Sequence, residues 1–131
     1  MIANQPSGFY SALKWAKSFG VPIIVTENGI EDGEDTLRPQ YIVEHIRELW
    51  RAVNFNFPIE GYFHWTLVDN FEWHQGWTFR YGLWHLDVET QKRTKRASAE
   101  LYEAICKENG LSSEMVEKFV PNVLEKMFPG I

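Results

Sequence analysis

Two short apolar runs, separated by a long helical pattern, limit most strongly what this chain can fold into. Residues 21–26 (VPIIVT) and 59–67 (IEGYFHWTL) are largely uninterrupted by polar residues. Such runs are typical of strands in a parallel sheet, because both faces of a parallel sheet are usually covered. Between the runs, Pro39 opens a stretch with apolar residues at helical spacing, namely Ile42, Ile46, Leu49, Trp50 and Val53. The order predicts a right-handed βαβ unit.

The segments outside this unit also predict regular elements. A helix is expected over residues 6–19, a hairpin over residues 81–96 and another helix over residues 97–109. A last helix is expected from about residue 112, and Pro121 should kink or break it. Two parallel strands alone cannot cover their faces and edges. We therefore expect further strands from elsewhere, or association of this chain with itself or another chain.

Composition and charge exclude several classes of protein. The chain has 131 residues, which is enough for one modest domain. Its net charge of −5 argues against partners such as nucleic acid or anionic membranes. No apolar run approaches the ~20 residues of a spanning helix, and no signal peptide is visible. The single cysteine, Cys106, follows Ile105 in a helical pattern and is expected to be a buried or half-buried thiol. These features predict a soluble, cytoplasmic protein.

Large aromatic rings are concentrated in one stretch of the chain. Aromatic residues make up 15% of the sequence, and four of the six tryptophans fall between residues 62 and 84: Trp65, Trp73, Trp77 and Trp84. Flat rings beside polar groups suit the C–H faces and hydroxyls of sugars, and they also suit protein interfaces. This stretch therefore predicts a surface that binds a sugar or a partner.

An acidic residue directly follows the first apolar run. Glu27 comes after VPIIVT and before the turn pair Asn28-Gly29. One interpretation is a strand that has ended and become polar loop. The other is a catalytic carboxylate that a rigid strand aims into a pocket.

Two motifs together resemble glycoside hydrolase family 1, the β-glucosidases, β-galactosidases and related β-glycosidases. The first is VTENG, residues 25–29, and the second is GYFHWTLVDNFEWHQGWTFRYGL, residues 61–83. The tetrapeptide TENG alone would be a weak signal, and the second motif at the family's spacing makes the resemblance specific. The resemblance covers roughly residues 6–109, whereas residues 110–131 read as a C-terminal helical extension without motifs.

The resemblance implies an α/β fold, a (β/α)8 barrel of which residues 1–131 would be the C-terminal part. Strands seven and eight, with their flanking helices, would be present. Active sites of such barrels lie at the C-terminal ends of the strands, which is where Glu27 stands. By resemblance Glu27 is the nucleophile of a retaining mechanism. Its carboxylate would attack the anomeric carbon and form a glycosyl ester that water then cleaves.

The resemblance also implies residues that bind and support the sugar. Glu72 would accept hydrogen bonds from sugar hydroxyls, Trp65 would pack on the sugar ring, and Trp73 would offer an indole N–H. Core packing is the alternative role for these side chains. The residues expected to support the site, mainly through hydrogen bonds within the loops, are Asn28, Asp69, Asn70 and Arg80.

Three further expectations concern the second motif and the histidines. The resemblance implies a cis peptide between Trp65 and Thr66. Strand alternation predicts that His64 points away from Trp65, towards the helix layer. No cofactor and no metal site are expected, because the remaining histidines show no ligand spacing: His45, His74 and His85.

One part of the family's catalytic apparatus is absent from the sequence. Retaining hydrolysis needs a second carboxyl group ~5–5.5 Å from the nucleophile, which the family supplies from an Asn-Glu-Pro motif that this chain lacks. A barrel of this kind takes ~250 residues or more. We therefore expect an isolated chain without activity, and a β-linked glycoside as substrate once the missing N-terminal portion of the barrel is supplied.

Two alternatives to that interpretation stay open. The chain could be a non-catalytic module that binds a sugar or a partner through the aromatic loop 62–84. It could instead self-associate and rebuild a barrel-like assembly from copies of itself. The sequence does not distinguish a glucoside from a galactoside or another glycone.

Overall fold

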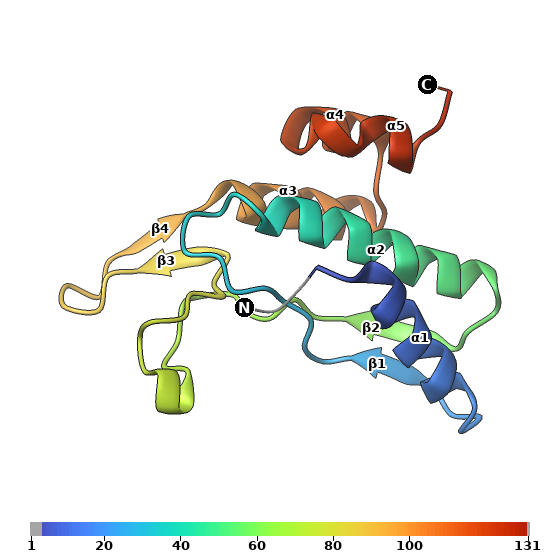
Figure 1. Ribbon diagram of the computed structural model, residues 1–131, viewed down its shortest axis with the longest axis horizontal. Coiled ribbons are helices and arrows are strands. Elements are labelled where there is room, and N and C mark those ends of the chain that lie inside the picture. Colours follow the sequence, from blue (N-terminus) through green and yellow to red (C-terminus); the bar gives the residue numbers. More distant parts are fainter. Residues whose placement is uncertain (1–3, 131) are drawn as a thin grey trace.

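The structure is a computed structural model that describes residues 4–130 (Figure 1). In chain order its elements are α1 (Pro6–Lys17), β1 (Ile23–Val25), α2 (Arg38–Asn54), β2 (Ile59–Tyr62), the 3-10 turn η1 (Trp73–Gln75), β3 (Trp84–Leu86), β4 (Arg93–Lys95), α3 (Ala97–Glu108), α4 (Ser113–Phe119), the 3-10 turn η2 (Pro121–Val123) and α5 (Leu124–Met127). Strands β1 and β2 are connected through α2 and pair in parallel, and β3 and β4 form an antiparallel hairpin. The order of elements expected from the sequence is confirmed.

The parallel pair has one packed face and one open face. Ile23 is buried in a cluster with Leu13 of α1 and Phe57, and Figure 1 shows α1, α2 and α3 gathered along one side of the pair. Ile24, whose side chain points the other way, is 52% exposed. The expectation that both faces are buried is therefore wrong for β1, because no segment among residues 4–130 covers the face that carries Ile24.

The main core lies between α2, α3 and the C-terminal helices. Ile42 of α2, Leu101 of α3 and Val116 of α4 are completely buried in one cluster. Helix α4 ends before Pro121, where η2 begins, so the expected break is confirmed. In Figure 1 this C-terminal extension lies over α2 and α3, on the side away from the strands. The extension therefore completes the main core and adds no strand to either sheet.

Two single residues test the sequence interpretation of buried positions. His64 is buried, and its ring lies 5.8 Å from the ring of Tyr102 of α3, as alternation along the strand predicted. Cys106 is exposed, so the prediction of a buried or half-buried thiol is wrong. Ile105 occupies the buried side of α3, and the next residue of a helix is turned well away from that side. No helix in the described part of the chain is long and apolar enough to cross a membrane.

Candidate active site

The two motifs lie against each other at the C-terminal ends of β1 and β2. Phe63 donates its backbone N–H to the carbonyl of Val25 (2.8 Å), and Trp65 donates to the carbonyl of Asn28 (3.0 Å). Three steps along the first segment therefore match two steps along the second, which is the pattern of a β-bulge. Bulges occur often beside active sites, where they redirect a side chain.

Close approach at this point requires a glycine. A Cβ atom added to Gly29 would lie 1.8 Å from the carbonyl oxygen of Trp65, so a side chain there would force the two segments apart. The Trp65–Thr66 peptide is cis, as the resemblance implied. The glycine of the first motif is thus explained by the backbone of the second.

Glu27 occupies the end of this junction. Its side chain is exposed, whereas that of the next residue, Asn28, is half-buried. Glu27 follows the end of β1 by only two residues. Its carboxylate is therefore held near a rigid element and faces open space. A carboxylate in this position can act as a nucleophile or as a hydrogen-bond acceptor towards a molecule that binds at the C-terminal ends of the strands.

Trp65 and Glu72 are brought together by a direct contact. The indole N–H of Trp65 donates to a carboxylate oxygen of Glu72 at 3.2 Å, and both side chains are half-buried. A flat ring beside a charged acceptor offers apolar packing and strong hydrogen bonding side by side. The pair therefore joins two of the three residues expected to bind a sugar.

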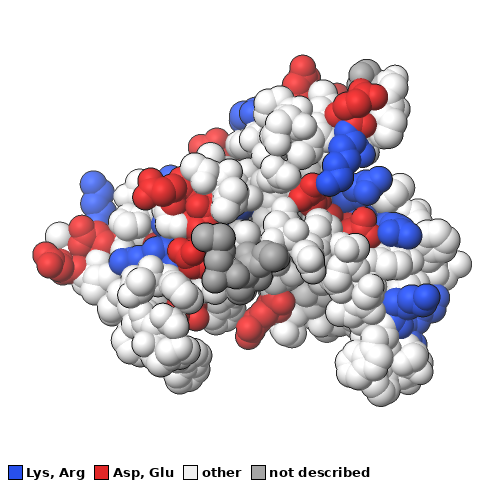
Figure 2. Space-filling model, viewed as in Figure 1, with Lys and Arg blue, Asp and Glu red and all other residues white. Residues whose placement is uncertain are grey.

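Trp73, the third of these residues, stands apart. It opens the turn η1, its φ is +47°, and its side chain is 83% exposed. Within residues 4–130 no side-chain hydrogen bond involves Trp73. The loop that carries it projects at the lower left of Figure 1 and is largely uncharged in Figure 2. Among the described residues no side-chain hydrogen bond joins Trp73 to Trp65, and the expectation that its indole N–H binds a sugar stays a prediction.

Asp69 is the centre of the hydrogen bonds that hold the second loop. Its buried carboxylate accepts the backbone N–H of Gly82 (2.8 Å) and of Leu86 (3.2 Å), and the guanidinium of Arg96 (3.0 Å). Burial acts to raise the pKa of Asp69, but the bonds from Arg96 and the two N–H groups outweigh it and lower the pKa below its ordinary value. The loop is thus fixed to the hairpin and to the start of α3.

The other two supporting residues of the second motif make weaker contacts. Arg80 places a guanidinium nitrogen 3.8 Å from Asp69 and donates to the carbonyl of Leu86 at 3.3 Å. The amide of Asn70 donates to the carbonyl of Phe71 at 3.4 Å, and its oxygen is buried without a partner among the described residues. Asn28, in the first motif, is held more tightly, between Tyr62 (2.8 Å) and Tyr41 (3.0 Å).

Sequence reasoning missed the residue that ties the first loop to the rest. The side chain of Arg38 is completely buried, pairs with Asp35, and donates to the carbonyl oxygens of Asp32 and of Arg80. Asp35 also accepts the backbone N–H of Ser98 at 2.9 Å. An acidic run before a helix usually indicates a solvated loop. Only the spacing of Asp35 and Arg38, one helical turn apart, could have suggested that they pair.

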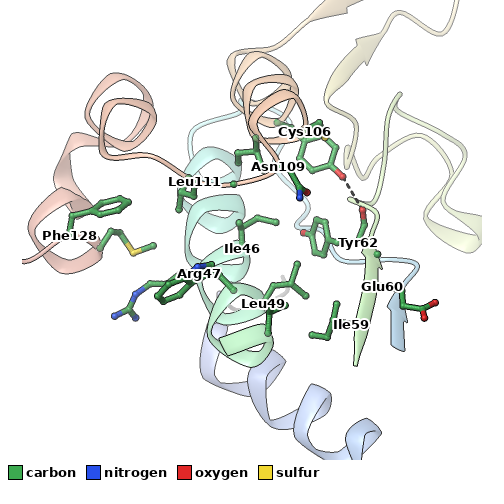
Figure 3. Close-up of a pocket in the computed structure, with 17 residues that line it drawn as sticks. Ile46, Arg47, Leu49, Ile59, Glu60, Tyr62, Cys106, Asn109, Leu111 and Phe128 are labelled. Atoms are coloured by element: carbon green, nitrogen blue, oxygen red, sulfur yellow. Dashed lines mark hydrogen bonds between the residues drawn. The ribbon is translucent and has the colours of Figure 1, made fainter. Parts of the chain in front are cut away.

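A hollow of about 750 Å³ lies at a distance from these groups (Figure 3). It is bounded by α2, β2, α3 and α5, and its lining is mainly apolar, including Ile46, Leu49, Ile59, Ile105 and Phe128. Tyr62 and Tyr102 also line it, and the hydroxyl of Tyr102 donates to the backbone carbonyl of Tyr62 (3.3 Å). Neither Glu27 nor Glu72 lines it. Within residues 4–130 no cluster of His, Cys, Asp and Glu could hold a metal ion.

Comparison with known proteins gives a consistent picture. The family described as glycosyl hydrolase family 1 matches residues 1–111. A β-galactosidase from Pyrococcus woesei is 40% identical over 116 residues, which are 88% of this chain and 23% of that protein. β-Glucosidase A from Thermotoga maritima is 39% identical over 117 residues, 81% of this chain and 26% of that protein.

The solved structures agree. The β-glycosidase from Thermosphaera aggregans matches with a TM-score of 0.82 and 44% identity, over 85% of this chain and 23% of that chain. The β-glycosidase from Pyrococcus horikoshii matches with a TM-score of 0.85 and 34% identity, over 89% and 28% respectively. The chain thus spans about a quarter of the length of these relatives.

Proposed function

Because the chain belongs to glycosyl hydrolase family 1, we propose that it is the nucleophile-bearing part of a retaining β-glycosidase. Its reaction is the hydrolysis of the O-glycosyl bond of a β-linked glycoside. The observation that carries the proposal is the junction of the two motifs, in which Asn28 and Trp65 are hydrogen bonded at 3.0 Å. This junction brings the loop that holds Glu27 alongside the loop that holds Glu72.

In the proposed reaction Glu27 acts first as nucleophile. Its carboxylate oxygen bonds to the anomeric carbon while the bond from that carbon to the leaving-group oxygen breaks. The leaving group takes a proton from a second carboxyl group, and the sugar remains as an ester on Glu27. A water molecule, deprotonated by that same second group, then cleaves the ester and frees Glu27. The exposed position of Glu27 beyond β1 is compatible with this attack.

In the same proposal Trp65 and Glu72 bind the glycone. The indole of Trp65 packs on the sugar ring, and its N–H holds one oxygen of Glu72 (3.2 Å). Glu72 keeps further lone pairs with which to accept sugar hydroxyls. Trp73 contributes its exposed indole N–H. A carboxylate acceptor makes strong hydrogen bonds, so its position selects among sugars by the direction of their hydroxyls.

We further propose that activity requires the rest of a barrel, with β1 and β2 as its strands seven and eight. The chain lacks Asn-Glu-Pro, and its relatives are about four times as long. Exposed apolar side chains on β1 and in the segment that follows β2 support this. Ile24 is 52% exposed, Phe63 is 61% exposed and Leu67 is 64% exposed. Strands one to six would cover such residues and supply the acid/base. Alone, the chain is expected to be inactive.

The experiment combines the chain with the missing part. The chain is produced together with the N-terminal portion of a relative that carries strands one to six and Asn-Glu-Pro, and hydrolysis of aryl β-glucosides and aryl β-galactosides is measured. These substrates are a suitable first choice because Thermotoga maritima β-glucosidase has been solved with glucoimidazole and with galacto-hydroximolactam.

Three variants distinguish the roles in this assembled enzyme. Glu27→Gln should abolish turnover while sugar binding survives, because an amide keeps the size but is a very poor nucleophile. Glu72→Gln should weaken rate and sugar selectivity together. Glu89→Gln, in the exposed turn of the hairpin, is the control and should behave as wild type. Wild-type activity in Glu27→Gln would refute the proposal, and turnover of ~1–10³ s⁻¹ by the chain alone would refute the need for the rest of the barrel.

A non-catalytic binding module is the second candidate function. The exposure of Trp73 (83%) and Phe71 (56%) favours it, because both rings are available to a ligand. Sugar binding by the chain alone, followed by tryptophan fluorescence and unchanged in Glu27→Gln, would support this candidate. The absence of activity in every assembled enzyme would support it further. Rebuilding of a barrel by copies of the chain would instead give an oligomer of defined mass that still lacks the Asn-Glu-Pro motif.

A further inference from the structure

We propose that Tyr41 and Tyr62 are positioning residues for the nucleophile and that they act through the side chain of Asn28. The inference rests on the proposed role of Glu27, the residue before Asn28. Tyr62 donates its hydroxyl to the amide oxygen of Asn28 at 2.8 Å, and the amide nitrogen of Asn28 donates to the hydroxyl of Tyr41 at 3.0 Å. One tyrosine comes from strand β2 and the other from helix α2.

Asn28 is held at a third point by its backbone. Its carbonyl oxygen accepts the N–H of Trp65 at 3.0 Å. The residue that follows Glu27 is therefore bonded through its amide oxygen, its amide nitrogen and its carbonyl oxygen to three other residues. Little rotation is left for the peptide that joins Glu27 to Asn28, and this peptide sets the direction in which the carboxylate of Glu27 leaves the chain.

The two tyrosines are themselves held in place. Tyr41 is buried, and its ring stacks on His45 with centroids 3.7 Å apart. The ring of Tyr62 lies edge-on to Phe9 at 6.4 Å and beside Tyr102 at 6.3 Å. Burial raises the pKa of Tyr41 to about 12 and that of Tyr62 well above its ordinary value. Both hydroxyls therefore stay protonated near neutral pH, as these hydrogen bonds require.

An amide side chain suits this position for a chemical reason. Asn28 presents an acceptor to Tyr62 and a donor to Tyr41, which are the two different ends of one amide. Displacement of a reacting group by about 1 Å can lower a rate by about 100-fold. A fixed Asn28 thus serves the nucleophile by restricting its direction, without itself touching the substrate.

The test uses the assembled enzyme, with Tyr41→Phe and Tyr62→Phe, each of which removes one hydroxyl and keeps the ring. Each should lower kcat by about 10- to 100-fold and change KM by less than about twofold, since ground-state sugar binding is untouched. Tyr10→Phe is the matched control. Tyr10 packs beside Phe57, at the opposite end of the strands from Asn28, and its variant should keep wild-type kinetics.

Two further measurements separate positioning from a general structural effect. In an Asn28→Ala background, Tyr62→Phe should cause no further loss, because both changes break the same connection. In a Glu27→Ala background with azide as external nucleophile, neither tyrosine variant should slow the azide-dependent reaction. A structural role would slow that reaction as well. Asn28→Ala also breaks the connection without altering a core ring, and so replaces a tyrosine variant that fails to fold.

The outcomes distinguish this inference from the proposed function. Full activity in Glu27→Gln would refute the proposed function itself. Loss of activity in Glu27→Gln, with wild-type kcat in both tyrosine variants and in Asn28→Ala, would refute the positioning role alone. Independent losses from Tyr62→Phe and Asn28→Ala, or an equal loss with azide, would refute the route through Asn28.

Discussion

Trp65 donates its backbone N–H to the backbone carbonyl of Asn28 at 3.0 Å, and this bond joins two motifs that are far apart in the sequence. The side chain of Asn28 is fixed at the same time by tyrosines from β2 and α2. The end of β1 and the end of β2 therefore form one unit. The positions of Glu27 and Glu72 both depend on this unit.

Gly29→Ala should disrupt that unit, because the new Cβ would lie 1.8 Å from the carbonyl oxygen of Trp65. Overpacking of this kind costs about 1–3 kcal/mol or more. We expect a lower free energy of unfolding in urea and loss of activity in the assembled enzyme.

Gly33→Ala is the matched control for this substitution. Gly33 lies in the same loop, and its new Cβ would be 3.8 Å from the side chain of Arg80, an ordinary contact. Equal stability of the two alanine variants would contradict the close approach of Gly29 to Trp65.

His64 should make the fold less stable in mild acid. Burial, with smaller effects from the charges of Arg38 and His45, lowers the pKa of His64 from 6.5 to about 3. Below pH 6.5 the unfolded chain binds a proton that the folded chain does not, so stability falls as the pH decreases from about 6.5 to about 3. Between pH 6.5 and pH 5 the free energy of unfolding should fall by about 2 kcal/mol.

Urea unfolding of His64→Leu checks this expectation. The variant should flatten the decline without abolishing it, because burial also lowers the pKa of His45. His74→Gln, at an exposed position, should leave the decline unchanged. The same slope in His64→Leu and in the wild type would contradict the account.

The purified chain should self-associate. Ile24 and Phe63 are more than half exposed on the open side of the parallel pair β1–β2. Within residues 4–130 no further strand pairs with either edge of this pair. Light scattering should give a mass above that of one chain, and Ile24→Ser with Phe63→Ser should lower it. Addition of the N-terminal barrel portion should convert the oligomers to a one-to-one complex. A monodisperse monomer of the wild-type chain would contradict this.

The elements could be predicted from the sequence because their signals are local. Proline and glycine mark the ends of α1 and the break at Pro121, and apolar spacing marks α2. The exposure of Ile24 could not be predicted, since it depends on what lies against the strand rather than on the strand itself. Cys106 was misplaced because a shift of one position on a helix changes the side that a residue faces.

The candidate site shows the same division. The residues of the two motifs could be found from their spacing, but not the contacts that hold them. Arg38 is completely buried, and its partners come from Asp35 nearby and from the distant carbonyl of Arg80. Buried arginines are rare, so a single sequence gives little reason to expect one. The exposed position of Trp73 likewise reflects the course of a loop that no local pattern determines.

Covalent trapping of the glycosyl ester tests the role of Glu27 most directly. In an aryl 2-deoxy-2-fluoro-β-glycoside, fluorine slows both formation and cleavage of the ester because it disfavours their oxocarbenium-like transition states. A good leaving group restores the rate of formation alone, so the ester accumulates. Peptides of the assembled enzyme are then analysed by mass spectrometry. We predict one added glycosyl group on the peptide that contains Glu27, absent in Glu27→Gln. A glycosyl group on another carboxylate, such as Glu72, or full turnover without any ester, would contradict Glu27 as the nucleophile.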